Sequence, residues 1–100
     1  MKTTKSMTFT PSTEARELLL FIVNHAELYR RSITPVIKSL QKKYNKGTYQ
    51  TEKAITTFYH VATEASKLYA KDLGYLFTVT ERFTAACDLE AYFIDEITNK

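Results

Sequence analysis

The apolar positions of this chain recur at the spacing of an α-helix almost throughout, and six of them are consecutive at 18–23. Residues three or four positions apart share one face of a helix. Thr10 followed by Pro11 is a helix-start signal, because the hydroxyl accepts a backbone N–H and proline loses no hydrogen bond there. We predict a central first helix over about 11–24, with the other helices around it. Its main apolar face would comprise Ala15, Leu18, Leu19, Ile22, Val23 and Ala26.

A second start signal and a glycine bound the next helix. Thr34 and Pro35 repeat the hydroxyl–proline pair, and Gly47 follows the last apolar position of the segment. A glycine directly after a helix is a common stop signal. These signals predict a second helix over about 35–45, preceded by a short helical turn near 26–32. Its buried positions would be Ile33, Val36, Ile37, Leu40 and Tyr44.

Two longer helices follow. Apolar residues keep three-four spacing from Ala54 to Tyr69, and Gly74 then interrupts the pattern. Thr78 and Glu81 form a capping box, in which each side chain satisfies a free backbone N–H of the other residue. We predict helices over about 51–72 and 79–97, paired as an antiparallel hairpin because their connection is short. The fourth helix would bury Val79, Phe83, Ala86, Leu89, Phe93, Ile94 and Ile97.

These elements predict an all-α fold, a compact bundle of four main helices. Two glycines and two prolines in 100 residues are too few for the many turns of a sandwich or barrel. A chain of this length can bury a core without metal or disulfides, and the single Cys87 cannot form an internal disulfide. We expect one helical domain over 10–100, after a flexible N-terminal tail over 1–9 that lacks the apolar part of a secretory signal.

Positive charge is concentrated in the second helix and the turn before it. Six lysine and arginine residues and no carboxylate lie between Leu28 and Thr51. Lys38, Lys42 and Lys46 are spaced by four and form one stripe opposite the apolar positions. Such a stripe is usually a solvated helix face, although with nearby tyrosines it can also hold phosphates and stack on bases. The candidate binding surface comprises Tyr29, Arg30, Arg31, Lys38, Lys42, Lys43, Lys46 and Tyr49.

The fourth helix has the opposite charge. Glu81, Asp88 and Asp95 are expected on its outer face, where they would repel a polyanion. Glu90 instead projects near the middle of the predicted apolar stripe, so its carboxylate needs a partner or a raised pKa. A structural bond to a tyrosine or an arginine is the simpler interpretation, and a functional carboxylate in a pocket is the alternative. The arginines considered are Arg16, Arg30 and Arg82.

No arrangement of residues indicates an enzyme. His25 and His60 are far apart in sequence and only Cys87 could supply sulfur, so the spacing of metal ligands is absent. His60 and Glu64 are one helical turn apart and could pair, which is ordinary support for a helix. Glu90 has no second catalytic group at a recognisable spacing. We therefore expect no catalytic residue, no cofactor and no metal site.

Several short motifs together resemble a group of known proteins. They are Glu14-Ala15-x-Glu17-Leu18-Leu19-Leu20-x-Ile22-x-Asn24, Leu28-Tyr29-Arg30, Pro35-x-Ile37-x-x-Leu40, Lys46-Gly47-x-Tyr49 with Glu52-Lys53-Ala54, and Tyr69-Ala70-Lys71-Asp72-x-Gly74. Over about 14–97 the chain resembles short uncharacterised accessory proteins encoded by tailed phages and mobile elements. The resemblance implies a phage accessory protein and assigns no catalytic or binding residue. The chain departs from it at His25-Ala26, where the relatives have an Asp-Gly-like turn.

We expect the protein to act by binding another macromolecule. The first hypothesis is a phage-type accessory protein that binds a host or phage protein, for example to inhibit a defence or transcription complex, since seven tyrosines suit an interface. The alternative is a nucleic-acid-binding accessory protein that uses the basic face of the second helix. A homodimer that shares apolar surface of the third helix is a further hypothesis. The apolar run at 18–23 is shorter than the about 20 residues of a membrane span, and the expected location is the cytoplasm, of a host bacterium if the chain is phage-encoded.

Overall fold

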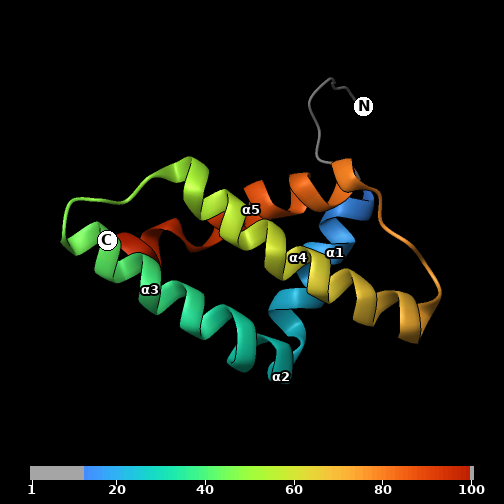
Figure 1. Cartoon of the computed structure of the whole chain (residues 1–100). Helices are drawn as coiled ribbons and strands as arrows, with labels where there is room; N and C mark the ends of the chain where they lie inside the picture. Colours follow the sequence, from blue (N-terminus) through green and yellow to red (C-terminus); the bar gives the residue numbers. More distant parts are fainter. Residues whose placement is uncertain (1–12, 100) are drawn as a thin grey trace, which may run out of the picture.

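The computed structural model describes residues 13–99 and contains only helices and their connections in that range (Figure 1). The elements are α1 Thr13–Asn24, α2 Ala26–Leu28, the π-helix η1 Tyr29–Ile33, α3 Thr34–Asn45, α4 Thr51–Leu73 and α5 Val79–Thr98. The prediction of an all-α compact bundle with four main helices is confirmed. The predicted bounds of the last three helices are correct to within one residue. The predicted tail over 1–9 and the start signal at Thr10 and Pro11 lie outside the described residues.

The two glycine stop signals and the capping box are confirmed. Gly47 and Gly74 have φ angles of +76° and +79°, the left-handed conformation that glycine adopts without a steric penalty. At the start of α5, the Thr78 hydroxyl accepts the Glu81 N–H at 3.1 Å, and the Glu81 carboxylate accepts the Thr78 N–H at 2.9 Å. This reciprocal pair is the predicted capping box, and it fixes where α5 begins.

The second predicted start signal lies where α3 begins, at Thr34, but the helix there continues from η1 and has no extended N-cap residue. Thr34 has helical angles of φ −56° and ψ −47°, and its N–H donates to the Tyr29 carbonyl. The chain is therefore helical from Ala26 to Asn45. In a regular α-helix the Pro35 ring would press against the carbonyl four residues before it. The π-helix widens this turn, since its hydrogen bonds reach one residue further back, and so accommodates the proline.

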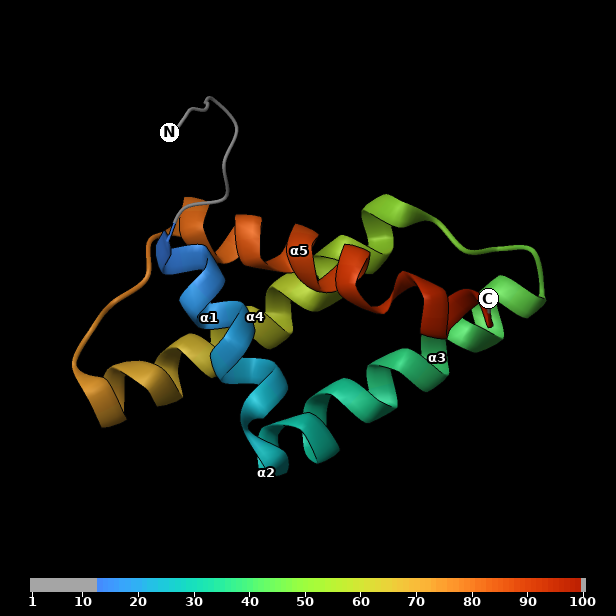
Figure 2. The same cartoon turned by 180° about the vertical axis from the view of Figure 1, so that it is seen from behind.

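α5 is the helix around which the fold is organised. It forms an antiparallel hairpin with α4 and also packs against α1 and α3 (Figures 1 and 2). The prediction of a central first helix is wrong: α1 buries Leu18, Leu19 and Ile22, but Leu20 is 42% exposed. A 20-residue helix is about 30 Å long and a 12-residue helix about 18 Å long. α5 packs extensively against all three other long helices.

The core lies along the seam between α4 and α5. Phe93 of α5 stacks on Phe58 of α4, with ring centroids 6.1 Å apart. Ala85, Ala86 and Leu89 of α5 have no exposed surface. Small side chains allow two helices to approach closely, so these alanines bring α5 close to its neighbour. The largest fully buried side chains are Phe58, Phe93, Leu18, Ile22, Ile33, Leu89 and Ile97.

Several predicted core residues lie outside this seam. Val79 is 62% exposed, Phe83 is 53% exposed, and Tyr44 at the end of α3 is also exposed. The buried face of α5 is centred on Leu89 and Phe93, about one residue step away from the face on which Val79 and Phe83 project. Val36 and Ile94 are only partly buried, and Ala26 is exposed.

Candidate interaction surface

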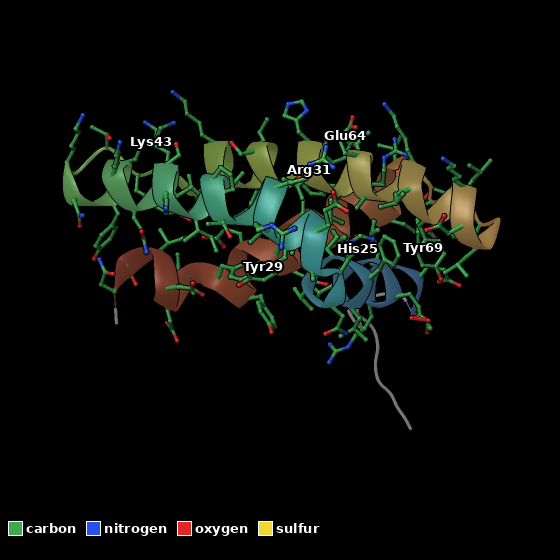
Figure 3. The ribbon with its side chains drawn as sticks, turned by 90° about the horizontal axis from the view of Figure 1, so that it is seen from below. His25, Tyr29, Arg31, Lys43, Glu64 and Tyr69 are labelled. Atoms are coloured by element: carbon green, nitrogen blue, oxygen red, sulfur yellow. The ribbon has the colours of Figure 1, made fainter. Side chains whose placement is uncertain are left out.

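The fold separates the charges of the chain into two layers. Residues 26–73, which form α2, η1, α3, α4 and the loop before α4, carry nine lysine and arginine residues and four carboxylates, a net charge of +5. The two helices α1 and α5 carry two arginines and seven carboxylates, a net charge of −5. Figure 3 shows α3 and α4 along one side of the molecule, with α1 and the C-terminal part of α5 along the other. We call these the basic layer and the acidic layer.

The six cations of the predicted surface all lie in the basic layer and are exposed. Arg31 pairs with Glu27 one turn before it at 3.2 Å, and both side chains are more than half exposed. An ion pair in such a wet environment contributes little to stability. In Figure 3, Lys43 lies near the outer edge of the molecule on the α3 side, and Arg31 lies in the middle of the view, beside α4. Among the described residues, no ion pair engages Arg30, Lys38, Lys42, Lys43 or Lys46.

The two tyrosines of the predicted surface have a structural role instead. Tyr29 is partly buried and packs against Phe93 of α5, with ring centroids 5.9 Å apart. Tyr49 donates a hydrogen bond of 2.7 Å to Glu90 Oε2 and also packs against the core. Burial and the hydrogen bond to Glu90 raise the pKa of Tyr49 well above its usual range. A tyrosine is therefore the partner of Glu90, as expected, and neither ring is free to stack on a base.

α4 adds cations to the basic layer that the sequence interpretation missed. Lys43 of α3 and Lys53 of α4 line one shallow hollow of about 210 Å³, together with the buried Leu40 and Ala54. Lys67 and Lys71, which are four positions apart on α4, line a second hollow with Arg31. Their spacing was visible as a helical stripe in the sequence. What was not visible is that this stripe faces the same side as the cations of η1.

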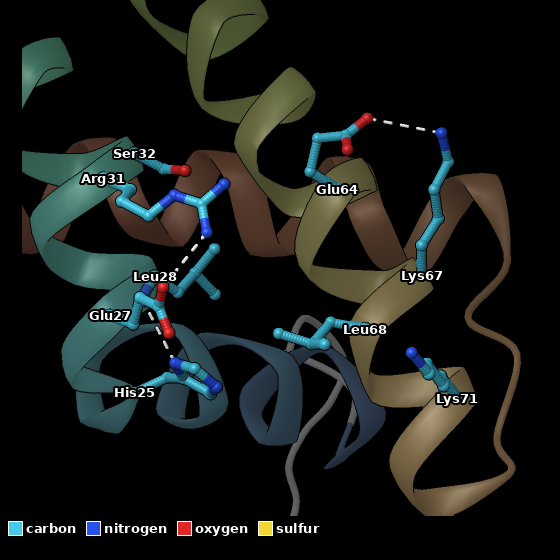
Figure 4. Close-up of a pocket in the computed structure, with 9 residues that line it drawn as sticks. All are labelled: His25, Glu27, Leu28, Arg31, Ser32, Glu64, Lys67, Leu68 and Lys71. Atoms are coloured by element: carbon cyan, nitrogen blue, oxygen red, sulfur yellow. Dashed lines mark hydrogen bonds and ion pairs between the residues drawn. The ribbon is translucent and has the colours of Figure 1, made fainter.

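The second hollow has a volume of about 530 Å³ (Figure 4). It lies between α2 and η1 on one side and α4 on the other. The Glu64 carboxylate accepts from Lys67 Nζ at 3.3 Å, and not from His60 as the sequence had suggested. We call this hollow the His25 pocket. Its lining residues are His25, Glu27, Leu28, Arg31, Ser32, Glu64, Lys67, Leu68 and Lys71.

In the acidic layer, two of the three carboxylates expected on the outer face of α5 are partly buried. Glu81 forms the capping box and also accepts the Tyr75 hydroxyl at 3.1 Å. Burial raises the pKa of Asp88, and the Arg16 guanidinium of α1 opposes that shift. Asp95 is exposed, as predicted.

Apolar side chains are exposed where the α4–α5 hairpin turns. Leu76 is 79% exposed, and Leu73 of α4 and Val79 of α5 are more than half exposed. Leu73 also lines a groove of about 520 Å³ between α1 and α4, together with Leu20 and Tyr69. Exposed apolar residues gathered in one region are typical of a surface that contacts another molecule.

The described residues contain no cluster of side chains suited to metal binding. No group of three or more His, Cys, Asp or Glu residues between 13 and 99 is placed to hold a metal ion. Burial, with the Asp88 and Glu90 carboxylates nearby, raises the pKa of the Cys87 thiol, so the reactive thiolate is disfavoured. Nor is any helix in this range long and apolar enough to span a bilayer.

The fold and its surfaces define a small all-α protein with a basic layer, an acidic layer and an apolar hairpin turn. Comparison of the chain with protein-family models, with curated proteins and with solved structures finds no match. Any assignment of function must therefore come from these surfaces.

Proposed function

We propose that this chain is a phage-type accessory protein that acts in the cytoplasm of a bacterial host by binding the acidic surface of another protein through its basic layer. The observation that carries the proposal is the separation of charge: nine cations against four carboxylates on one side of the molecule, and two against seven on the other. Complementary charge orients a partner during encounter and suppresses the wrong faces. The resemblance of residues 14–97 to phage accessory proteins agrees with such a role, for example as an inhibitor of a host defence or transcription complex.

Two features favour a protein partner over a nucleic acid. The side chains of Tyr29 and Tyr49 pack against the core, so the aromatic platforms on which bases stack are missing from the predicted surface. The basic layer also contains four carboxylates, which repel phosphates but can pair with the cations of a protein surface. These carboxylates are Glu27, Glu52, Glu64 and Asp72.

Nucleic acid binding is the second candidate, and the outer stripe of α3 favours it. Lys38, Lys42 and Lys46 are exposed and no carboxylate of α3 interrupts them. Contacts from such a stripe to phosphates would release counterions and make the affinity fall steeply with salt. A homodimer through the exposed apolar residues of the hairpin turn is the third candidate.

Affinity capture from a bacterial lysate distinguishes these candidates. The bait is the tagged full chain as wild type, as Lys43→Glu with Lys53→Glu, and as the charge-preserving control Lys43→Arg with Lys53→Arg. We expect the wild type and the control to recover the same protein at about 0.15 M salt, and the charge-reversed chain to recover about tenfold less.

Recovery of no specific protein, or equal recovery by all three baits, would contradict a protein partner on the basic layer. The wild-type chain and a further variant, Lys38→Glu with Lys42→Glu, are assayed against mixed-sequence DNA and RNA by fluorescence anisotropy. Binding that Lys38→Glu with Lys42→Glu abolishes would support the nucleic-acid candidate. Recovery of only an untagged second copy of the chain would support the homodimer.

A further inference from the structure

The His25 pocket combines an apolar floor with a rim of hydrogen-bond donors. Leu28 of α2 and Leu68 of α4 are partly buried and face each other across the pocket. Figure 4 shows the donors His25, Arg31 and Lys71 around these two leucines. Because the leucines come from segments 40 residues apart in the chain, only the packing of α4 beside α2 and η1 creates this floor.

The hydrogen bonding of His25 determines what its ring offers to the pocket. His25 is the N-cap of α2, and its Nδ1 accepts the Leu28 N–H at 3.2 Å. A nitrogen that accepts a hydrogen bond carries no proton, so the proton of the neutral ring is on Nε2. The ring also packs against Phe21 of α1, with centroids 5.3 Å apart, which holds its orientation. His25 therefore presents a positioned N–H donor to the pocket.

One of the three cations on the rim of the pocket has no ion-pair partner among the described residues. Arg31 and Lys67 are each paired with a carboxylate on their own side of the pocket, at 3.2 Å and 3.3 Å. Among the described residues, no ion pair or hydrogen bond engages the ammonium group of Lys71. Three cations and two carboxylates give the rim a net charge of +1, within a layer whose net charge is +5.

We propose that the His25 pocket binds a singly charged carboxylate that carries a short aliphatic body. The carboxylate accepts from Lys71 Nζ, the His25 N–H supplies a second donor elsewhere on the same rim, and the aliphatic body covers Leu28 and Leu68. The ammonium group of Lys71, unpaired among the described residues, suits a carboxylate, and the leucine floor suits its aliphatic body, which inorganic phosphate lacks. This inference does not depend on the proposed function, because such a ligand would bind whether or not a protein docks on the basic layer.

Two sources supply this chemistry: a free short-chain carboxylic acid, and the C-terminal carboxylate of a polypeptide that ends in an aliphatic residue. Hexanoate and N-acetylglycyl-leucine represent them in a titration of the isotope-labelled full chain followed by NMR. We expect at least one to shift the His25 ring and the Leu28 and Leu68 methyl resonances saturably, with a dissociation constant of about 1 mM. The probe that binds more tightly identifies the source.

Two variants test the donors separately. Lys71→Glu should weaken binding about tenfold, while Lys42→Glu, which changes the net charge equally but lies on the outer stripe of α3, should have no more than about a twofold effect. His25→Asn keeps an N-cap acceptor for the Leu28 N–H but removes the ring donor, so it should weaken binding without unfolding α2.

Three results would overturn the proposal. The first is the absence of saturable shifts at these residues with either carboxylate up to about 10 mM. The second is an equal response to inorganic phosphate or to hexylammonium, because neither combines a single negative charge with an aliphatic body. The third is an equal effect of Lys71→Glu and Lys42→Glu, which would mean that the probe responds to overall charge and not to this pocket.

Discussion

Glu90 and Tyr49 illustrate how a single polar contact ties a loop to the core. Tyr49 lies in the loop between α3 and α4, and its hydroxyl donates to Glu90 of α5 across 41 residues of sequence. Both side chains are only partly exposed. A carboxylate in such a place requires a donor, because an unsatisfied charge at the edge of the core is unfavourable. The contact therefore holds the start of α4 against α5.

We predict that Tyr49→Phe lowers the free energy of unfolding by about 1–2 kcal/mol at pH 7, since Glu90 loses its donor. The raised pKa of Tyr49 means that its contribution is fully present below the ordinary tyrosine pKa of about 10 and is lost as the pH rises above it. The difference between wild type and variant should therefore shrink above pH 10. Urea unfolding at pH 7 and at pH 10.5 measures both effects, and a difference that grows with pH would contradict them.

Arg82 is a second residue whose role only the structure reveals. Its guanidinium donates to the Phe77 carbonyl at 2.8 Å and to the Tyr59 hydroxyl at 3.2 Å, and it lies over the Tyr59 ring. Its Nε atom is buried, and no acceptor among the described residues contacts it. Arg82 thus joins the connection before α5, α5 itself and α4, although the sequence named it only as one possible partner of Glu90.

At the scale of elements, the ends of the helices follow local chemistry closely. The glycine stops and the capping box act through backbone atoms within a few residues, so they could be identified from sequence alone. The π-helix could not, because a proline after a hydroxyl residue is equally compatible with a helix start and with a widened turn inside a helix. Packing of the buried Ile33 and Ile37 on either side of Pro35 keeps the segment helical.

We predict that Gly74→Ala destabilises the protein by about 1–2 kcal/mol, because alanine disfavours the left-handed conformation at φ +79°. Beyond the adjoining residues, no atom lies within 4 Å of the place that the alanine Cβ would take, so the penalty comes from the backbone and not from a clash. Gly74→Asn, which tolerates this conformation better, should lose less. Thermal unfolding of the three proteins measures the order, and equal stability of the alanine variant would contradict it.

At the scale of the whole molecule, α5 joins the other long helices and, together with α1, forms the acidic layer. It contacts α1, α3 and α4, and its buried face includes Phe93 and Leu89. Several buried residues of the seam with α4 are alanines. Alanine is a weaker signal of a buried position than a large apolar residue. That is why the sequence placed Phe83 in the core and Glu90 at the centre of the apolar face.

We predict that Phe93→Ala destabilises the protein by about 3–5 kcal/mol, because Phe93 is 1% exposed and its removal leaves a cavity beside Phe58. Phe83→Ala, at a position that is 53% exposed, should change stability by less than about 1 kcal/mol. Urea unfolding of both variants tests whether the buried face of α5 is the one described. Similar losses at the two positions would contradict it.

Part of the candidate surface could be predicted from the sequence, and part of it depends on the tertiary structure. The exposed lysines of α3 could be identified from the sequence, because a stripe opposite an apolar face depends only on helical periodicity. The addition of Lys53, Lys67 and Lys71 from α4 could not, because it depends on which face α4 turns toward α5. The same is true of the inward orientation of Tyr29 and Tyr49.

The sequence by itself determined the helices, their caps and the stripe of lysines on α3, because periodicity, capping and glycine conformation act over a few residues. Only the tertiary structure decided that α5 is the central helix, that Tyr49 is the partner of Glu90, and that the His25 pocket forms between α2, η1 and α4. Those outcomes depend on how helices distant in the chain rotate and approach one another. That choice is made by the summed packing of many side chains, which no local pattern encodes.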